Sequence, residues 1–319
     1  MLFRTLALPA AVAASITPPR SPAVTCENPT IRKEWRSLSS DERDSYISAV
    51  HCLAKQPSKL GLDTTQYDDF PFVHNALNDD IHFVASFLPW HRYFVHVYEQ
   101  ALKECGYTGA VAYWDWTLDS DDTSKSSIWD PVTGVGGNGD PNNTITIDGS
   151  TSKCVSDGPF KDLRPAYITD TLVPHCLRRN FNNGTEQIGN MFSEAYTPEA
   201  IAKINAFSDY DNFHNELEGG PHGAIHSSVA GDMMPATSPN DPLFFLHHTQ
   251  IDRLWYLWQQ GDPEIRTNAY GGIKTQSNPG EPTPPQATLD DIMPMLNIAK
   301  DIPVRDIMST QSELLCYTY

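Results

Sequence analysis

The sequence has no surplus of positive charge and, beyond its first residues, no long hydrophobic run. Its 22 Lys and Arg residues are outnumbered by 40 Asp and Glu residues, so the formal net charge is −18. Nucleic acids and anionic membranes bind basic surfaces, so neither is expected as a partner. A transmembrane helix needs about 18 consecutive apolar residues, which no later segment supplies. With 39% hydrophobic residues, the chain can instead bury a sizeable core.

The first residues form a distinct segment. The stretch MLFRTLALPAAVAAS has one early Arg4, an apolar run from Leu6 to Ala14, and small residues at its end. This is the pattern of a secretory signal peptide, and the run is too short to span a bilayer. The alternative is a buried helix that is retained. We expect residues 1–18 to be removed and residues 19–319 to form one secreted, extracellular domain.

The cysteines lack C-x-x-C spacing, which argues against a zinc or thioredoxin-like redox site. An even number in an exported chain indicates three disulfides, formed among Cys26, Cys52, Cys105, Cys154, Cys176 and Cys316. Six cysteines allow fifteen pairings, and the sequence does not choose among them. Asn142 and Asn183 begin N-x-S/T sequons and are candidate glycosylation sites.

Helical patterns dominate the sequence. Ser39 and Glu42 have the spacing of a capping box. Three longer helices are predicted: from Ser39 to a point before Pro57, from Pro89–Trp90 to Cys105–Gly106, and from about Pro242 to Gln260. Shorter helices are predicted at TPEAIAKINAF and at PHGAIHSSV, where Pro221 falls in the first turn. Residues 117–190 are rich in Gly, Asn, Asp, Ser and Pro and predict long disulfide-pinned loops. The expected fold is mainly α, with few short strands.

Histidine spacing suggests a metal site. Most of the 11 histidines fall into two clusters, a first with His74, His82 and His91 and a second with His222, His226, His247 and His248. His222 and His226 stand at i and i+4, so both imidazoles project from one helix face. An isolated H-x-x-x-H is more often a packing or surface feature. Here a second helix and a separate cluster offer further imidazoles, which favours ligation.

The donor type narrows the choice of metal. Three imidazoles per ion suit copper or zinc, whereas calcium and magnesium require oxygen ligands. The H-E-x-x-H signature of zinc proteases is absent, because Gly223 stands where that signature has glutamate. A hydrolytic zinc enzyme is therefore the weaker alternative.

Four motifs carry a resemblance to a known family. FLPWHRYFVHVYEQAL, AYWDW, PHGAIH and SPNDPLFFLHHTQIDRLW resemble the copper-binding regions of the type-3 copper proteins, which are tyrosinases, catechol oxidases and haemocyanins. Within that group the chain is most similar to secreted fungal polyphenol oxidases. The resemblance implies a central four-helix bundle that holds two copper ions, with O2 as co-substrate and small phenols as substrates.

The resemblance also implies a ligand set, in which the first copper is bound by His74, His82 and His91 and the second by His222, His226 and His248. The family's ligand in the doublet is its second histidine. Successive helical residues point about 100° apart, so we expect His247 to have a structural role or a place at the site entrance. The isolated histidines are expected at the surface or hydrogen-bonded in the core: His51, His96, His175 and His214.

Glu218 and Gly223 bear on the reaction. A phenol has a pKa near 10, so its hydroxylation at neutral pH requires a base. Glu218 matches the glutamate that holds a water beside the second copper in relatives; the alternative is a surface carboxylate. Good monophenol hydroxylases usually have Asn where this chain has Gly223. The resemblance therefore implies oxidation of o-diphenols (catechols) to o-quinones, with weak or no monophenol hydroxylation. The alternatives are a true tyrosinase with strong monophenol hydroxylation and a haemocyanin-like oxygen carrier.

Other positions refine the resemblance. Asp80 stands where many fungal relatives have a cysteine cross-linked to the second ligand, so His82 is expected to lack a thioether. Residues 317–319 resemble the Tyr-x-Tyr motif that closes the catalytic domain, and no C-terminal lid domain is expected. Arg32 is a candidate to stack on those tyrosines, and Asp252 to orient polar groups near the metals. The preferred phenol and the oligomeric state, monomer or dimer, stay open.

Overall fold

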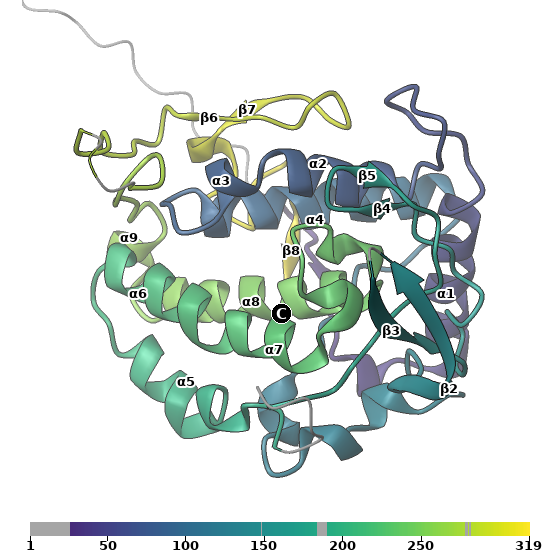
Figure 1. The fold of residues 1–319 in the computed structure, drawn as a ribbon. Coiled ribbons are helices and arrows are strands. Elements are labelled where there is room, and N and C mark those ends of the chain that lie inside the picture. The colour runs from purple at the N-terminus through teal and green to yellow at the C-terminus, as the bar shows by residue number, and fades with distance from the viewer. Residues whose placement is uncertain (1–25, 148, 184–189, 278–279, 281) are drawn as a thin grey trace, which may run out of the picture.

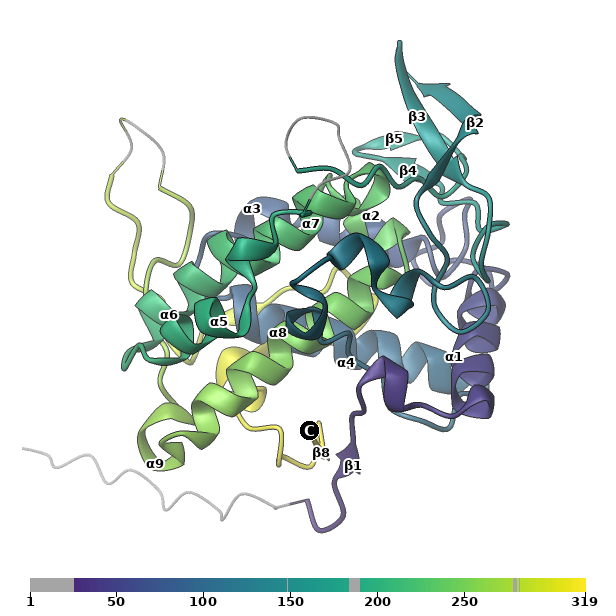
Figure 2. The ribbon, with the colours of Figure 1, turned by 90° about the horizontal axis from the view of Figure 1, so that it is seen from below.

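Two long helices, α4 (Phe87–Glu104) and α8 (Leu243–Gln260), lie against each other at the centre of the molecule (Figures 1 and 2). The computed structural model describes residues 26–147, 149–183, 190–277, 280 and 282–319. The predicted signal peptide, residues 1–18, lies outside them. Both helices bury side chains around most of their circumference, as a helix at the centre of a protein must.

The remaining helices surround this pair. They are α1 (Ser40–Leu53), α2 (Asp69–Ala76), α3 (Asn78–Ile81), α5 (Pro198–Asn205), α6 (Tyr210–Leu217), α7 (Gly223–Val229) and α9 (Pro263–Arg266). With α4 and α8, the α2 segment and the continuous α6–α7 segment complete the central bundle (Figure 2). The predicted mainly α fold is therefore confirmed. No helix of the described residues combines the length and hydrophobicity that a membrane span requires.

Local signals explain several helix starts. The Ser39 hydroxyl accepts from the Glu42 backbone N–H at 3.2 Å, and the Glu42 carboxylate accepts from the Ser39 N–H at 2.8 Å, so the predicted capping box is present. Thr197 caps α5 ahead of Pro198. α4 begins two residues before the predicted Pro89, which still lies in the first turn, where its missing N–H leaves no helical hydrogen bond unmade.

Pro221 does not begin a helix. It lies inside a π-helical turn, Glu218–His222, that joins α6 to α7 without a break. Proline has no N–H to donate, so an ordinary α-helical turn cannot close here and the backbone widens instead. The widened turn presents the side chains of Glu218 and His222 to the protein interior, where both are buried.

The strands lie at the periphery and form four two-stranded pairs in the described part of the chain. The pairs are β1 (Thr30–Ile31) with β8 (Tyr317–Thr318), in parallel, and β2 (Gly139–Ile147) with β3 (Ser150–Val155), β4 (Tyr167–Ile168) with β5 (Thr171–Leu172) and β6 (Ile292–Met293) with β7 (Ile302–Pro303), all antiparallel. The β2–β3 hairpin corrects the expectation that residues 117–190 are almost all loop. Its register shifts between Asp140 and Thr144, where Pro141 cannot donate to the ladder.

The three predicted disulfides are present as Cys26–Cys316, Cys52–Cys105 and Cys154–Cys176. The first reinforces the β1–β8 pairing and joins the two ends of the described chain. The guanidinium carbon of Arg32 lies 3.6 Å from the centre of the Tyr317 ring, so the predicted stacking is confirmed. Asn142 is exposed on β2, and its glycosylation stays a prediction; the Asn183 sequon extends outside the described residues.

Candidate metal centre

The first histidine cluster is assembled from three segments. His74 comes from α2, His91 from α4, and His82 from an extended residue that follows α3. One ring nitrogen from each lies within 4.8 Å of the other two. The Nε2 atoms of His74 and His91 are 3.2 Å apart. The short α3 and the extended backbone at His82 return the chain to the site, which sequence spacing alone does not reveal.

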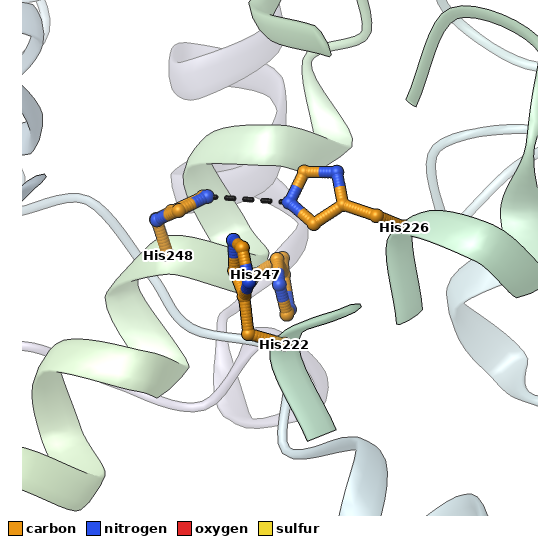
Figure 3. A group of neighbouring side chains, drawn as sticks. All are labelled: His222, His226, His247 and His248. Atoms are coloured by element: carbon orange, nitrogen blue, oxygen red, sulfur yellow. Dashed lines mark hydrogen bonds between the residues drawn. The ribbon is translucent and has the colours of Figure 1, made fainter. Parts of the chain in front are cut away.

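The second cluster contains four imidazoles (Figure 3). His222 comes from the π-helical turn, His226 from α7, and His247 and His248 from α8. One ring nitrogen from each of the four lies within 4.8 Å of the others, and the Nε2 atoms of His226 and His248 are 3.4 Å apart. The i, i+4 pair predicted from the sequence does share one helix face.

The two clusters belong to one site. The rings of His91 and His248 stack with centroids 4.4 Å apart and an interplanar angle of 16°. The rings of His82 and His222 also stack, at 6.1 Å. The packing of α4 on α8 therefore places a ligand candidate of each cluster in direct contact with the other cluster.

Backbone carbonyl groups set the tautomer of five imidazoles. In the first cluster, Nδ1 lies 2.6 Å from the Ala236 carbonyl oxygen in His74, 3.1 Å from that of Asn78 in His82 and 2.8 Å from that of Phe87 in His91. In the second cluster, Nδ1 lies 3.1 Å from the Glu218 carbonyl oxygen in His222 and 2.5 Å from that of Met233 in His226. A carbonyl oxygen can only accept, so each Nδ1 carries the proton and each Nε2 presents a lone pair to the site. These nitrogens fit a metal that binds neutral imidazoles.

Burial keeps these imidazoles uncharged. Desolvation lowers the pKa of His82 and of His226 to about 4, and it lowers the pKa of His74, His91, His222 and His248 well below the usual range. Neighbouring imidazoles add to the effect in most of them. A neutral donor set can bind a cation without first losing protons.

His247 lies where helical geometry did not predict it. Its side chain is completely buried, and its ring is 5.5 Å from the ring of His222, 5.0 Å from that of His226 and 5.1 Å from that of His248. A place at the site entrance is therefore wrong. The neighbouring α7 approaches α8 closely enough that both members of the doublet reach the cluster despite their different directions on the helix.

Glu218 is buried beside the clusters, not a surface carboxylate. Its Oε1 atom accepts from the backbone N–H of Phe83 at 2.8 Å, and its Oε2 atom has no hydrogen-bond partner in the described part of the chain. Burial raises the pKa of Glu218 to about 8. Phe83 adopts a left-handed backbone conformation, φ +55°, which is unusual for a bulky residue and aims its N–H at Glu218. A Cβ added at Gly223 would meet only the Glu218 carbonyl oxygen, at an ordinary 3.5 Å.

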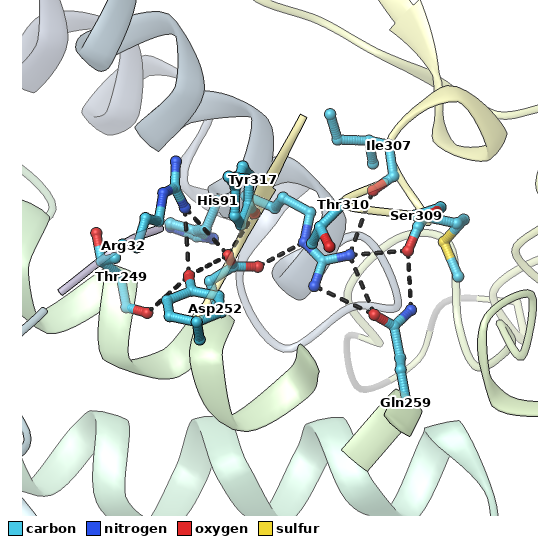
Figure 4. Close-up of polar contacts among 12 residues, drawn as sticks. Arg32, His91, Thr249, Asp252, Gln259, Ile307, Ser309, Thr310 and Tyr317 are labelled. Atoms are coloured by element: carbon cyan, nitrogen blue, oxygen red, sulfur yellow. Dashed lines mark hydrogen bonds and ion pairs between the residues drawn. The ribbon is translucent and has the colours of Figure 1, made fainter. Parts of the chain in front are cut away.

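A buried charge network connects the two metal-binding helices (Figure 4). Asp252, one turn beyond His248 on α8, accepts from Arg92 Nε at 2.5 Å and from Arg32 Nη1 at 3.1 Å. The hydroxyl groups of Tyr317 and Tyr319 also donate to this carboxylate. Arg92 directly follows a first-cluster histidine on α4, so Asp252 fixes α4, α8 and both chain ends relative to one another.

The isolated histidines are accounted for outside the clusters, as predicted. His51 lies 2.8 Å from the Pro159 carbonyl oxygen, His175 lies 2.9 Å from Asp232, His214 lies 3.2 Å from Asp211, and His96 packs beside Tyr93. Among the described residues, none of them joins a group with metal-ligand geometry.

Sequence reasoning missed two groups that contact the site. The indole N–H of Trp116 donates to His247 Nδ1 at 3.2 Å, and the backbone of Phe83 holds Glu218. Trp116 belongs to the AYWDW motif, but that motif gave no indication of its partner. A backbone contact such as that of Phe83 leaves no signal in side-chain patterns.

Comparisons with known proteins agree with this geometry. The family model for the common central domain of tyrosinase matches residues 64–261. Tyrosinase ustQ of Aspergillus flavus is 44% identical over 295 residues, which cover 92% of this chain and 80% of that protein. Tyrosinase P of Aspergillus terreus is 33% identical over 93% of this chain and 94% of that protein. The structure of a mutant polyphenol oxidase from Thermothelomyces thermophila superposes with a TM-score of 0.75 and 32% identity, covering 91% and 88%. The chain therefore belongs to the tyrosinase family and is a type-3, dinuclear copper oxidoreductase.

Proposed function

We propose that the chain is a secreted polyphenol oxidase that uses O2 to oxidise o-diphenols to o-quinones, with little hydroxylation of monophenols. The observation that carries the proposal is the pair of facing histidine clusters whose Nε2 lone pairs converge. The N-terminal signal pattern and the three disulfides support secretion.

We assign His74, His82 and His91 to the first copper ion, and His222, His226 and His248 to the second. Five of the six have the carbonyl-bound Nδ1 that leaves Nε2 free, and this supports the assignment. The side chain of His82 is oriented by the Asn78 carbonyl, which supplies a constraint in place of the thioether that Asp80 cannot form.

When bound, the copper pair supplies the two-electron exchange between a diphenol and O2, with the overall balance of two diphenols and one O2 giving two quinones and two waters. The protein holds the imidazoles at fixed orientations and packs aromatic rings against them. Phe87 packs at 4.8 Å from the His222 ring, and Phe244 stacks at 4.0 Å on the His248 ring. Glu218 Oε2 is buried without a partner among the described residues, and because burial raises the pKa of Glu218 to about 8, its ionised form is a stronger base than an ordinary carboxylate for the proton that a phenolic hydroxyl releases.

The preference for diphenols is inferred from Gly223. A monophenol holds its proton at neutral pH, so its deprotonation requires a well-oriented base. Gly223 directly follows His222 and has no side chain to share with Glu218 in orienting a water. A diphenol does not need the hydroxylation step, so this absence limits monophenols more.

The decisive experiment compares O2 uptake with a monophenol and with its matching o-diphenol, on protein with its copper content measured. We expect about two coppers per chain, rapid uptake with the diphenol, and slow uptake after a lag with the monophenol. Rapid hydroxylation without a lag would contradict the diphenol preference, and reversible O2 binding without diphenol oxidation would indicate an oxygen carrier. N-terminal sequencing of protein exported by a fungal host tests removal of residues 1–18.

A further inference from the structure

We propose that His247 is a hydrogen-bond donor within the group of imidazoles on the second metal side of the site and that Trp116 sets its tautomer. The inference rests on the proposed function only for the identity of the group that accepts this hydrogen bond. The tautomer of His247 follows from its contact with Trp116 and does not depend on the substrate.

The tautomer follows from the chemistry of the contact between Trp116 and His247. The indole nitrogen of tryptophan is only a donor. Because it lies 3.2 Å from His247 Nδ1, that nitrogen must accept and cannot carry a proton. A neutral imidazole carries one proton, which therefore sits on Nε2. This is the reverse of the arrangement in the five histidines whose Nδ1 atoms donate to carbonyl oxygens.

The tautomer excludes ligation. A protonated ring nitrogen has no lone pair to give to a metal, and the other nitrogen of His247 is occupied by Trp116. The two members of the doublet thus differ chemically as well as in direction. His248 Nδ1 has no hydrogen-bond partner in the described part of the chain, so nothing there forces its proton onto Nε2.

The Nε2–H group of His247 is poised for an acceptor. It is buried and has no hydrogen-bond partner among the described residues. Its ring stacks on His222, at an interplanar angle of 19°, inside the group of four imidazoles (Figure 3). A buried donor without an acceptor is destabilising. An anionic oxygen bound at the second metal would relieve this cost.

The deprotonated oxygen of a phenolic substrate has the chemistry that such a donor recognises. A neutral N–H group in a dry site binds an anion more strongly than a neutral oxygen, because charge-assisted hydrogen bonds are the stronger kind. His247 would thereby favour the phenolate over the phenol at the second metal, while the imidazole ligands hold the metal itself.

The direct test is nitrogen NMR of the histidine rings in the oxygen-free, fully reduced holoenzyme, whose Cu(I) ions are diamagnetic. We expect His247 to show a protonated Nε2 and an unprotonated Nδ1, and the Trp116→Phe variant to show a mixture of tautomers. The matched control is Trp114→Phe, since Trp114 is equally buried but donates to Asp119. A metal-bound or unprotonated Nε2 in the wild-type protein would overturn the proposal.

The functional test compares His247→Leu with His247→Gln, because glutamine can place an amide N–H near the position of Nε2. Both variants should keep two coppers per chain. We expect kcat/KM for an o-diphenol to fall on the order of 100-fold in the leucine variant and to recover at least roughly tenfold in the glutamine variant. One copper per chain in His247→Leu would show that His247 is a ligand, and equal kcat/KM in the two variants would show that no donor is needed.

These outcomes separate the inference from the proposed function. If the wild-type protein oxidises no diphenol, the proposed function fails, and the NMR measurement and copper content still decide the tautomer and the ligand status of His247. If diphenol oxidation is found and the tautomer is the opposite one, only the inference fails.

Discussion

The two histidine clusters face each other but are built differently. The first takes one histidine from each of three segments, whereas the second takes two from one helix face and adds a doublet from α8. Glu218 Oε2 and His247 Nε2, which have no hydrogen-bond partner in the described part of the chain, also lie beside the second cluster, as do the ring nitrogens His222 Nε2 and His248 Nδ1 that lack partners there too. On the proposed function, the first cluster would mainly hold its metal, while the second side would also handle the substrate's protons and charge.

The largest expected effect comes from removing one imidazole. His248→Ala should lower the copper content from two ions per chain to one and reduce diphenol turnover at least roughly 1000-fold. His91→Ala should do the same from the first side. Copper analysis and O2 uptake measure both effects. His51→Gln, outside the clusters, is the control and should keep both coppers; full activity in either alanine variant would contradict the ligand assignment.

The next effect tests whether the clusters depend on one shared support. Asp252→Asn leaves the buried Arg92 without a carboxylate and Arg32 with Glu99 alone, and breaking a buried ion pair costs about 3–5 kcal/mol. We expect a large fall in the thermal unfolding temperature and weaker retention of both coppers. Asp79→Asn, at an exposed position, should change stability little. Loss of copper from the second cluster alone would show that Asp252 does not couple the two.

The third prediction concerns the pH dependence of stability and distinguishes His96, which is buried on α4, from the ligand candidate His91 on the same helix. Burial lowers the pKa of His96 on α4 to about 4, with Glu99 opposing and Arg32 and Lys103 adding to the shift. Below pH 6.5 the unfolded chain binds a proton here and the folded chain does not, so stability falls as the pH drops from 6.5 to 4.

The His96→Gln variant has no such titration. Its free energy of unfolding should fall less across that window, by at most roughly 3 kcal/mol, while its copper content stays at two. Denaturant titrations at several pH values provide the measurement. Wild-type and variant curves that run parallel from pH 6.5 to pH 4 would contradict the role given to His96.

The smallest effect concerns the residue next to the first ligand of the second cluster. Gly223→Asn should raise the ratio of monophenol to diphenol oxidation by about tenfold, because an amide can help Glu218 orient a water. The site has room for the side chain, since a Cβ there meets only one atom, at 3.5 Å. Gly219→Asn is the control, because a Cβ at Gly219 meets nothing within 4 Å. An equal change in both variants would argue against a specific role for position 223.

The sequence predicted what depends on local rules and left open what depends on tertiary packing. The capping box, the bounds of α8 to within one residue, and the shared face of His222 and His226 follow from periodicity and spacing. The meeting of His74 with His91 requires α2 to pack beside α4, and no local rule provides that. The resemblance supplied this part of the site.

Two errors have physical causes. Pro221 was expected to start a helix because proline favours first turns, but here the chain enters from α6 already helical and widens around it. His247 was expected to point away, because helical geometry gives a direction but not the position of the neighbouring helix. The partner that fixes its proton, Trp116, is 131 residues distant in sequence.

The Cys26–Cys316 bond turns nearly the whole described chain into a covalent ring. A single cut in an exposed segment, such as the β2–β3 hairpin, would then open the ring without releasing a fragment. Protease-nicked protein should migrate as one species in a denaturing gel and separate into two only after reduction. Because Arg32 and Tyr317 meet beside the same bond, the ring also keeps the ends of the chain at Asp252, and a nicked molecule would retain the support of its metal-binding helices.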